Sequence, residues 1–229
     1  MVRREVLTLR GPIRDGHGPT LRIREPEQTR AVVLVMHGGK VVSDRPGRWR
    51  HLNVVRMQPF AHDIARGRHA DGVAVCSLLF ARRGWNDTGA PVEDALWALN
   101  EIRTRFGPVP VVLLGHSMGG RTAVRVAGHP SVVGVVGLAP WLPAGEPADQ
   151  LAGRALTIIH GTRDVWVPLK LSRAFVDGFA GAPIDVEFVA LPATGHTMLR
   201  RARIWQRLAS DAVARMLTAS LSRPCAEAS

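Results

Sequence analysis

The sequence has little cysteine: Cys76 lies in an apolar stretch and Cys225 lies near the C-terminus. Two cysteines so placed do not form the disulfide framework that small secreted proteins use, so we expect a reducing compartment. Long apolar runs are also lacking. No stretch of about 18 apolar residues occurs, and no apolar run of about 7 to 15 residues follows the charged N-terminus. We therefore expect a soluble, cytoplasmic protein without a membrane partner.

Lysine is nearly absent, because only Lys40 and Lys170 are lysines among the 30 Lys and Arg residues, against 19 Asp and Glu. The formal net charge of +11 makes nucleic acid a partner to consider. However, the arginines are scattered from Arg3 to Arg223 and nowhere form a basic run. No recognition module and no interleaving of aromatic and basic residues accompanies the charge. We therefore expect a solvated basic surface and no nucleic-acid partner.

The remaining composition is that of a folded globular protein. Of the 229 residues, 46% are hydrophobic and 21% are charged, which is far from the composition of disordered chains. A chain of this length buries one sizeable core and leaves little room for a second. We therefore expect a single domain over residues 1–229, with a loose C-terminal tail at about 220–229.

Apolar runs alternate with amphipathic segments along the chain. Most of the runs are rich in β-branched residues and lack polar alternation, which is typical of strands buried on both faces. Strands are predicted at 5–10, 20–25, 31–37, 72–80, 109–116, 132–140, 155–161 and 185–192. Helices are predicted at 54–68, 91–106, 118–128, 168–180 and 201–218. The alternation predicts an α/β fold, with a mostly parallel central sheet of about eight strands, helices on both faces and the two N-terminal strands as an antiparallel edge.

Residues 110–122 read PVVLLGHSMGGRT, and residues 115–119 fit the pattern G-x-S-x-G. The pattern follows a predicted buried strand and precedes a predicted helix, so the serine lies on a sharp turn between them. The flanking glycines let neighbouring segments approach closely, and strained backbone holds the hydroxyl of Ser117 above the sheet. N–H groups at the helix start favour the negative charge that develops when a carbonyl is attacked. Ser117 is thus a candidate nucleophile; the alternative is a small residue that a tight turn accommodates.

A serine hydroxyl needs a base and an orienting acid to react, and later strands are followed by candidates for both. Asp164 comes just after the predicted strand at 155–161, and His196 comes just after the one at 185–192. The order Ser117, Asp164, His196 is one of the chain orders in which serine hydrolases carry their triad. The spacing therefore predicts a Ser-His-Asp triad.

Other residues could fill these roles, although the sequence favours them less. Asp164 could merely stabilise a turn, and Asp149 would then be the substitute acid. His160 stands at the end of a predicted strand and is interpreted as a buried structural histidine. His116 is interpreted as a neighbour of the serine turn.

The loop after the predicted strand at 31–37 offers a place for an oxyanion. It begins with His37, Gly38 and Gly39, and glycine allows the backbone to approach the reacting atoms closely. We expect the N–H groups of Met118 and Gly39 to form the oxyanion hole, with Gly38 as the nearest substitute. His37 is expected to hold this loop by a hydrogen bond rather than to take part directly.

The sequence resembles the α/β-hydrolase superfamily through four motifs that are spread over nearly the whole chain. They are HGG at 37–39, GHSMGG at 115–120, HGTRDVWVP at 160–168 and GHTML at 195–199. The resemblance implies Ser117 as nucleophile, His196 as general base and then general acid, and Asp164 as the acid that orients it. Dienelactone hydrolases and haloalkane dehalogenases are set aside, since their nucleophiles are cysteine and aspartate.

Two departures from the wider superfamily are informative. Many members insert a lid after the strand corresponding to 132–140, whereas here only residues 141–154 fill that place. We therefore expect the small, capless serine hydrolase or esterase branch, with an open site. The segment ARRGWNDTG at 81–89 also differs from the glycine-rich loop of lidded relatives. Trp85 and Trp141 are possible walls of the substrate pocket, although they could simply cover the sheet edge.

The resemblance implies hydrolysis of a small-molecule carboxylic ester or thioester through an acyl-enzyme, without a metal or an organic cofactor. Because this fold hosts many chemistries, an acyltransferase or a cofactor-free lyase on the same triad is an alternative. A non-catalytic binding module that keeps the fold is a second one. Arg45, Arg48 and Arg50 could gather an anionic substrate or form a solvated loop. The oligomeric state is left open.

Overall fold

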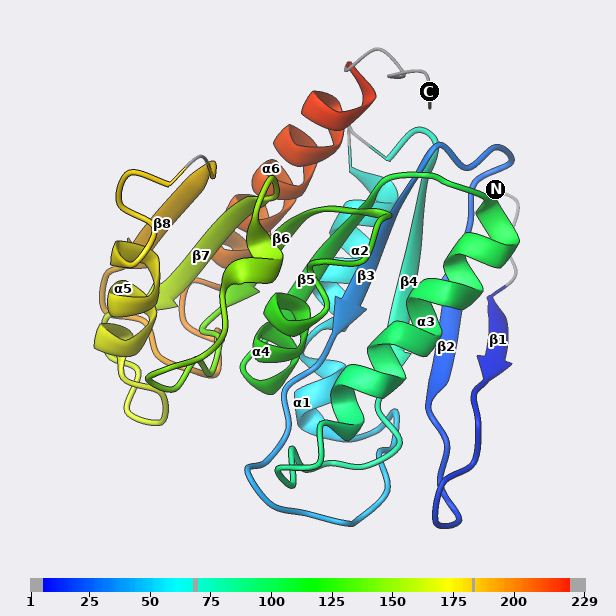
Figure 1. Ribbon diagram of the computed structural model, residues 1–229, viewed down its shortest axis with the longest axis horizontal. Helices are drawn as coiled ribbons and strands as arrows, with labels where there is room; N and C mark the ends of the chain where they lie inside the picture. The colour runs from blue at the N-terminus through cyan, green and yellow to red at the C-terminus, as the bar shows by residue number, and fades with distance from the viewer. Residues whose placement is uncertain (1–5, 68–69, 183, 223–229) are drawn as a thin grey trace.

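The computed structural model describes residues 6–67, 70–182 and 184–222, and its central feature is an eight-stranded sheet (Figure 1). The strands are β1 (Leu7–Arg10), β2 (Thr20–Arg24), β3 (Ala31–Met36), β4 (Val73–Leu79), β5 (Val111–His116), β6 (Val132–Leu138), β7 (Ala155–Gly161) and β8 (Val186–Leu191). Their order across the sheet is β1-β2-β4-β3-β5-β6-β7-β8. β1 and β2 are antiparallel at one edge and the other six strands are parallel, which confirms the predicted sheet.

Helices cover both faces of this sheet. They are α1 (Leu52–Val55), α2 (Gln58–Arg66), α3 (Ala90–Phe106), α4 (Met118–Arg125), α5 (Leu169–Asp177) and α6 (Ala202–Leu221), with a 3-10 turn, η1, at Asp149–Leu151. In Figure 1, α3 and α4 lie in front of the sheet and α2 and α6 lie behind it. Two apolar clusters, one on each face, join the helices to the strands.

The central strands belong to both apolar clusters because successive side chains of a strand point to opposite faces. In β3, Val32 and Leu34 pack in the cluster with α3 and α4, whereas Val33 and Val35 pack in the cluster with α2 and α6. Every residue of β3, β4 and β5 is buried. This double burial explains why these strands are continuously apolar in the sequence.

The helix predicted over 54–68 is wrong in extent, because α1 and α2 replace it. Proline in a helix interior removes a hydrogen bond and clashes with the preceding turn. Pro59 avoids this cost by lying in the first turn of α2, where no intrahelical N–H bond is made. The chain therefore breaks after Val55 and starts a new helix, which leaves α1 as a separate turn beside the loop at 37–51.

The C-terminal end of the chain differs in part from the expectation. α6 continues to Leu221, so the start of the tail predicted from about residue 220 is helical. The rest of that predicted tail, residues 223–229, lies outside the described residues. Within the described part of the chain, no helix is both long and apolar enough to cross a membrane.

The parallel strands end at one edge of the sheet, and the segments that follow them there carry all the predicted site residues. Gly38 and Gly39 follow β3, Ser117 follows β5 and Asp164 follows β7. After β6, residues 141–154 contain only the short turn η1 and no inserted lid. Ligands of open α/β sheets bind outside the carboxyl ends of the strands, which is where these residues meet.

Candidate active site

Ser117 occupies a strained turn between β5 and α4. Its backbone angles are φ 53° and ψ −116°, and an L-residue adopts such a conformation only when the surroundings impose it. Two glycines make room for the turn. A Cβ at position 119 would lie 2.6 Å from the carbonyl oxygens of Met36 and His37, and a Cβ at position 115 would overlap the backbone of residue 119. The predicted reason for both glycines, close approach of backbone segments, is therefore confirmed.

Backbone hydrogen bonds fix this turn on both sides. The N–H of Ser117 donates to the carbonyl of Leu138 at 3.1 Å, and the carbonyl of Ser117 accepts from the N–H of Trp141 at 3.1 Å. The same carbonyl accepts from Gly120 and Arg121 in the first turn of α4. The turn is thus tied to the end of β6 and to the start of the 141–154 segment.

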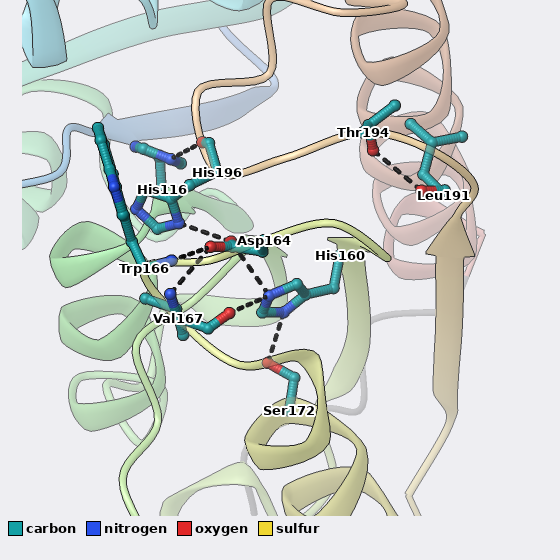
Figure 2. A network of polar contacts seen from close by, with 9 residues as sticks. All are labelled: His116, His160, Asp164, Trp166, Val167, Ser172, Leu191, Thr194 and His196. Atoms are coloured by element: carbon teal, nitrogen blue, oxygen red, sulfur yellow. Dashed lines mark hydrogen bonds and ion pairs between the residues drawn. The ribbon is translucent and has the colours of Figure 1, made fainter.

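Asp164 and His196 meet at the ends of β7 and β8, as Figure 2 shows. The Nδ1 atom of His196 lies 2.7 Å from Oδ2 of Asp164. The N–H groups of Trp166 and Val167 both donate to Oδ1 of Asp164 at 2.9 Å. Burial alone would raise the pKa of the Asp164 carboxyl, but hydrogen bonds from His160, His196 and Val167 lower it well below its usual value. Asp164 is therefore held ionised beside the imidazole.

Among the described residues, no hydrogen bond is made to Nε2 of His196, because the contact with Asp164 is made by Nδ1. With Nδ1–H donating to Asp164, the tautomer assigned from its partners presents an unprotonated Nε2. The imidazole is packed between two rings, His116 at 4.7 Å and Trp166 at 5.4 Å between centroids. In the part of the chain that the structure describes, no hydrogen bond joins Ser117 to His196. Such catalytic bonds are often long or poorly aligned without substrate and tighten when it binds.

His160 is part of this site, although the sequence only suggested a buried structural histidine. Its side chain is fully buried at the end of β7, with Nε2 3.3 Å from Oδ2 of Asp164 and 3.0 Å from the carbonyl oxygen of Val167. Its Nδ1 lies 2.9 Å from the hydroxyl of Ser172, which is also fully buried (Figure 2). Asp164 thus has a histidine on each side, and His160 stands between the acid and α5. The only sequence signal was the proximity of His160 to Asp164, four residues apart.

His116 supports the loop that carries His196. Its Nε2 lies 3.0 Å from the backbone carbonyl oxygen of His196, to which it donates. Complete burial, together with the proximity of His196, lowers the pKa of His116 well below its usual value, so the ring is neutral. His116 lies under the reacting imidazole and holds its backbone, which extends the neighbour role predicted for it.

His37 and Asn53 orient the peptide between Gly38 and Gly39. The Nδ1 atom of His37 lies 2.6 Å from the carbonyl oxygen of Gly38, and the amide of Asn53, on α1, donates to the same oxygen. Nε2 of His37 accepts from the N–H of Phe80 at 3.2 Å. Burial lowers the pKa of His37 to about 4, so the ring remains neutral. Since a trans peptide points its N–H opposite to its C=O, holding this carbonyl aims the N–H of Gly39 the other way.

The proposed oxyanion donors lie against the serine turn. A Cβ at position 38 would lie 3.3 Å from Cβ of Ser117, and one at position 39 would collide with the side chain of Met118. Among the described residues, the N–H groups of Gly39 and Met118 donate to no other backbone group. Met118 is the first residue of α4, where an N–H has no partner within the helix. The sequence did not indicate Asn53, because it reaches this loop from another element.

Trp85 and Trp141 contact a buried cation rather than an open cavity. The guanidinium of Arg121, on α4, lies 4.1 Å from the centroid of Trp85 and 4.6 Å from that of Trp141. Arg121 also lies 2.7 Å from the carboxylate of Glu146, which Arg125 contacts from the other side. Trp85 is buried in the core, which argues against an open pocket wall at this position. Trp141 is partly buried beside Ser117, and its pocket role stays a prediction.

In the part of the chain that the structure describes, the other candidate residues make no hydrogen bond to Ser117, Asp164 or His196. Asp149 begins η1, and the imidazole contact is made by Asp164 instead. Arg45, Arg48 and Arg50 are exposed in the loop after β3, which fits a solvated loop. Within the described residues, no group of three or more His, Cys, Asp or Glu side chains is arranged to hold a metal ion.

The chain is similar to known proteins in sequence and in fold. The sequence model of the alpha/beta hydrolase family matches residues 28–224. An alpha-beta serine hydrolase homologue from Coxiella burnetii is similar in structure, with 19% identity, 92% of this chain and 98% of that chain covered, and a TM-score of 0.69. XC6422 from Xanthomonas campestris, described as an a/b serine hydrolase without lid, has 17% identity, coverages of 98% and 99%, and a TM-score of 0.73.

A third similar structure is Est2, a thermophilic esterase from Thermogutta terrifontis, with 16% identity, coverages of 98% and 95%, and a TM-score of 0.67. At these identities the likeness shows the fold alone. The chain matches no curated protein.

Proposed function

Because the chain belongs to the alpha/beta hydrolase family, we propose that it is a serine hydrolase that cleaves a small-molecule carboxylic ester or thioester through an acyl-enzyme. The observation that carries the proposal is the 2.7 Å contact between Asp164 and Nδ1 of His196, beside a strained serine turn. In the proposed triad, Asp164 is the ionised acid, His196 is the base that it orients and Ser117 is the nucleophile. The similar esterase and the similar serine hydrolase without lid support the same chemistry.

In the first half of the reaction, Nε2 of His196 removes the proton of the Ser117 hydroxyl while the serine oxygen attacks the carbonyl carbon. The carbonyl oxygen becomes an oxyanion, which accepts hydrogen bonds from the N–H groups of Gly39 and Met118. His196 then gives its proton to the leaving oxygen or sulfur, and the alcohol or thiol departs. Asp164 stabilises the imidazolium throughout without taking its proton.

In the second half, water replaces the leaving group. His196 removes a proton from that water, the hydroxyl attacks the acyl carbon, and the same oxyanion donors act again. Transfer of the proton from His196 back to the serine oxygen breaks the acyl bond and releases the carboxylic acid. The lidless edge of the sheet gives water direct access to this step.

Substitution of the nucleophile tests the proposal. Ser117→Ala should lower kcat/KM for p-nitrophenyl acetate by about three to six orders of magnitude, because the acyl-enzyme cannot form. Ser210→Ala, on α6 and away from the strand ends, is the matched control and should retain parent activity. Parent-like hydrolysis by folded Ser117→Ala would contradict the assignment, since the other groups of the site do not supply a nucleophile.

A further inference from the structure

Trp166 is the one tryptophan of the six in the chain whose side chain is exposed; its exposed fraction is 67%. Val165 beside it is 86% exposed, and Leu199, three residues after His196, is 73% exposed. Exposing large apolar side chains to water is unfavourable, and grouped exposure often marks a binding surface. Along the chain, Val165 and Trp166 directly follow Asp164, and Leu199 comes three residues after His196.

The position of Trp166 is fixed relative to the reacting imidazole. Its backbone N–H donates to Oδ1 of Asp164, and its ring centroid lies 5.4 Å from that of His196 (Figure 2). His116 packs against the same imidazole but is buried, so Trp166 is the ring on the side that solvent reaches. The carboxylate that orients the base therefore also places an exposed apolar plane beside it.

The chemistry of the triad decides which part of a substrate meets that plane. His196 protonates the leaving oxygen, so the alcohol portion of an ester must lie next to the imidazole. The carbonyl oxygen lies elsewhere, at the N–H groups of Gly39 and Met118. An alcohol portion that extends outward from His196 passes over Trp166.

We propose that Trp166, together with Val165 and Leu199, forms a leaving-group subsite that binds the apolar or aromatic body of the substrate's alcohol. This inference rests on the proposed hydrolase function and names the substrate class: esters of bulky apolar alcohols. Flat apolar and aromatic groups stack on an indole ring with favourable dispersion and burial. The subsite acts in acylation alone, because the alcohol has left before water attacks.

Two ester series separate this subsite from the acyl side. The first keeps the acetyl group and changes the alcohol from ethyl to hexyl and benzyl; the second keeps p-nitrophenol and lengthens the acyl chain. Trp166→Ala should lower kcat/KM for hexyl and benzyl acetate about tenfold more than it lowers kcat/KM for ethyl acetate, because any loss that comes from loosening the His196 imidazole is common to all three esters. Its dependence on acyl length should match that of the parent. Trp166→Phe should keep most of the preference, since it keeps an aromatic plane.

Trp49→Ala is the matched control. Trp49 lies in the loop after β3, and its ring packs on Arg22 of strand β2. This variant should keep the parent preference in both series. Acyl transfer gives a second readout, since an acceptor alcohol binds where a leaving alcohol departs. With p-nitrophenyl acetate and added hexanol, Trp166→Ala should form less hexyl acetate relative to acetate than the parent does.

An equal loss for all alcohols, a loss that follows acyl length, or an unchanged preference would overturn the subsite. Failure of the proposed function has a different signature: the parent would hydrolyse no ester of either series, ethyl acetate included. Persisting hydrolysis of ethyl acetate by Trp166→Ala shows that the triad works, so that a changed alcohol preference belongs to the subsite alone.

Discussion

Asn53 and His37 together orient the peptide between Gly38 and Gly39. Both side chains bind the carbonyl oxygen of Gly38, and the N–H of Gly39 is therefore directed away from them. Asn53 touches no reacting atom, so it is a positioning residue. Its contribution should be visible in kcat, because an oxyanion donor acts mainly in the transition state.

Asn53→Ala is expected to lower kcat for p-nitrophenyl acetate by about tenfold with little change in KM, because loss of one hydrogen bond loosens the oxyanion donor. Leu52→Ala is the control. Leu52 directly precedes Asn53 in α1 and is 79% exposed, so this variant should behave as the parent. An unchanged kcat in folded Asn53→Ala would show that His37 holds the peptide without it.

A related prediction concerns the effect of His160 on the Asp164 carboxyl. Its hydrogen bond lowers the pKa of Asp164, so His160→Leu should raise that pKa. A carboxyl with a raised pKa is protonated at higher pH. The pKa of Asp164 lies well below its usual value in the parent, and the carboxyl therefore stays ionised at neutral pH in the variant, but it is held less firmly beside the imidazole, so kcat at neutral pH should fall about ten- to hundredfold.

Ser172→Ala separates this role from packing. It removes the hydroxyl that contacts Nδ1 of His160 but leaves the contact between His160 and Asp164. Its kcat at neutral pH should stay close to that of the parent. A parent-like kcat in folded His160→Leu would show that His160 only fills space.

The three residues of the proposed triad can be predicted from the sequence, whereas the residues that position them cannot, and the reason is physical. Ser117, Asp164 and His196 can be inferred because each follows a recognisable strand, and parallel strands end at one edge. Asn53 and Trp166 contact residues of other segments. Such contacts depend on the conformation of the loops, which the sequence pattern does not predict. The same limit applies to Trp85, whose contact with Arg121 joins two segments that are far apart in the sequence.

Among the elements, the 141–154 segment occupies the place of a lid and is anchored by one carboxylate. Glu146 is buried, and Arg121 and Arg125 of α4 both contact it. The amide of Gln150 adds a hydrogen bond to the carbonyl of Val124 at 3.0 Å. The segment is therefore fixed to the helix that begins at the nucleophile.

Glu146→Ala should lower the free energy of unfolding by about 3 kcal/mol, because it leaves a largely buried guanidinium without its carboxylate. Glu25→Ala breaks the exposed pair between Glu25 and Arg105 and should cost less than about 1 kcal/mol. Urea unfolding of both variants measures the difference. Equal losses would show that the Glu146 cluster stabilises no more than a surface pair.

Periodicity predicts most of the elements because the strands are buried on both faces. It fails at residues 54–68, where the apolar spacing of α1 and α2 is nearly continuous and the break depends on Pro59. It also cannot show that β8 is an edge strand. Of the six residues of β8 only Leu191 is buried, although five of the six are apolar.

For the whole molecule, the order and spacing of motifs predict more than composition does. A net charge of +11 says nothing of the reaction, whereas HGG, GHSMGG and two later strand ends predict both the sheet and the site. The fold is shared with serine hydrolases and an esterase at 16–19% identity and hosts many chemistries, so it does not determine the substrate. Specificity depends on exposed side chains at the strand ends, which the fold leaves free to vary.

Ser117, as the proposed nucleophile of the triad, should be the residue that reacts with an electrophile. The most direct measurement is labelling of the purified protein with a fluorophosphonate, followed by peptide mapping by mass spectrometry and a parallel assay of ester hydrolysis. We expect one label per chain on Ser117, loss of hydrolysis in proportion to labelling, and no label in Ser117→Ala. A label on another residue, or full hydrolysis after complete labelling of Ser117, would contradict this assignment.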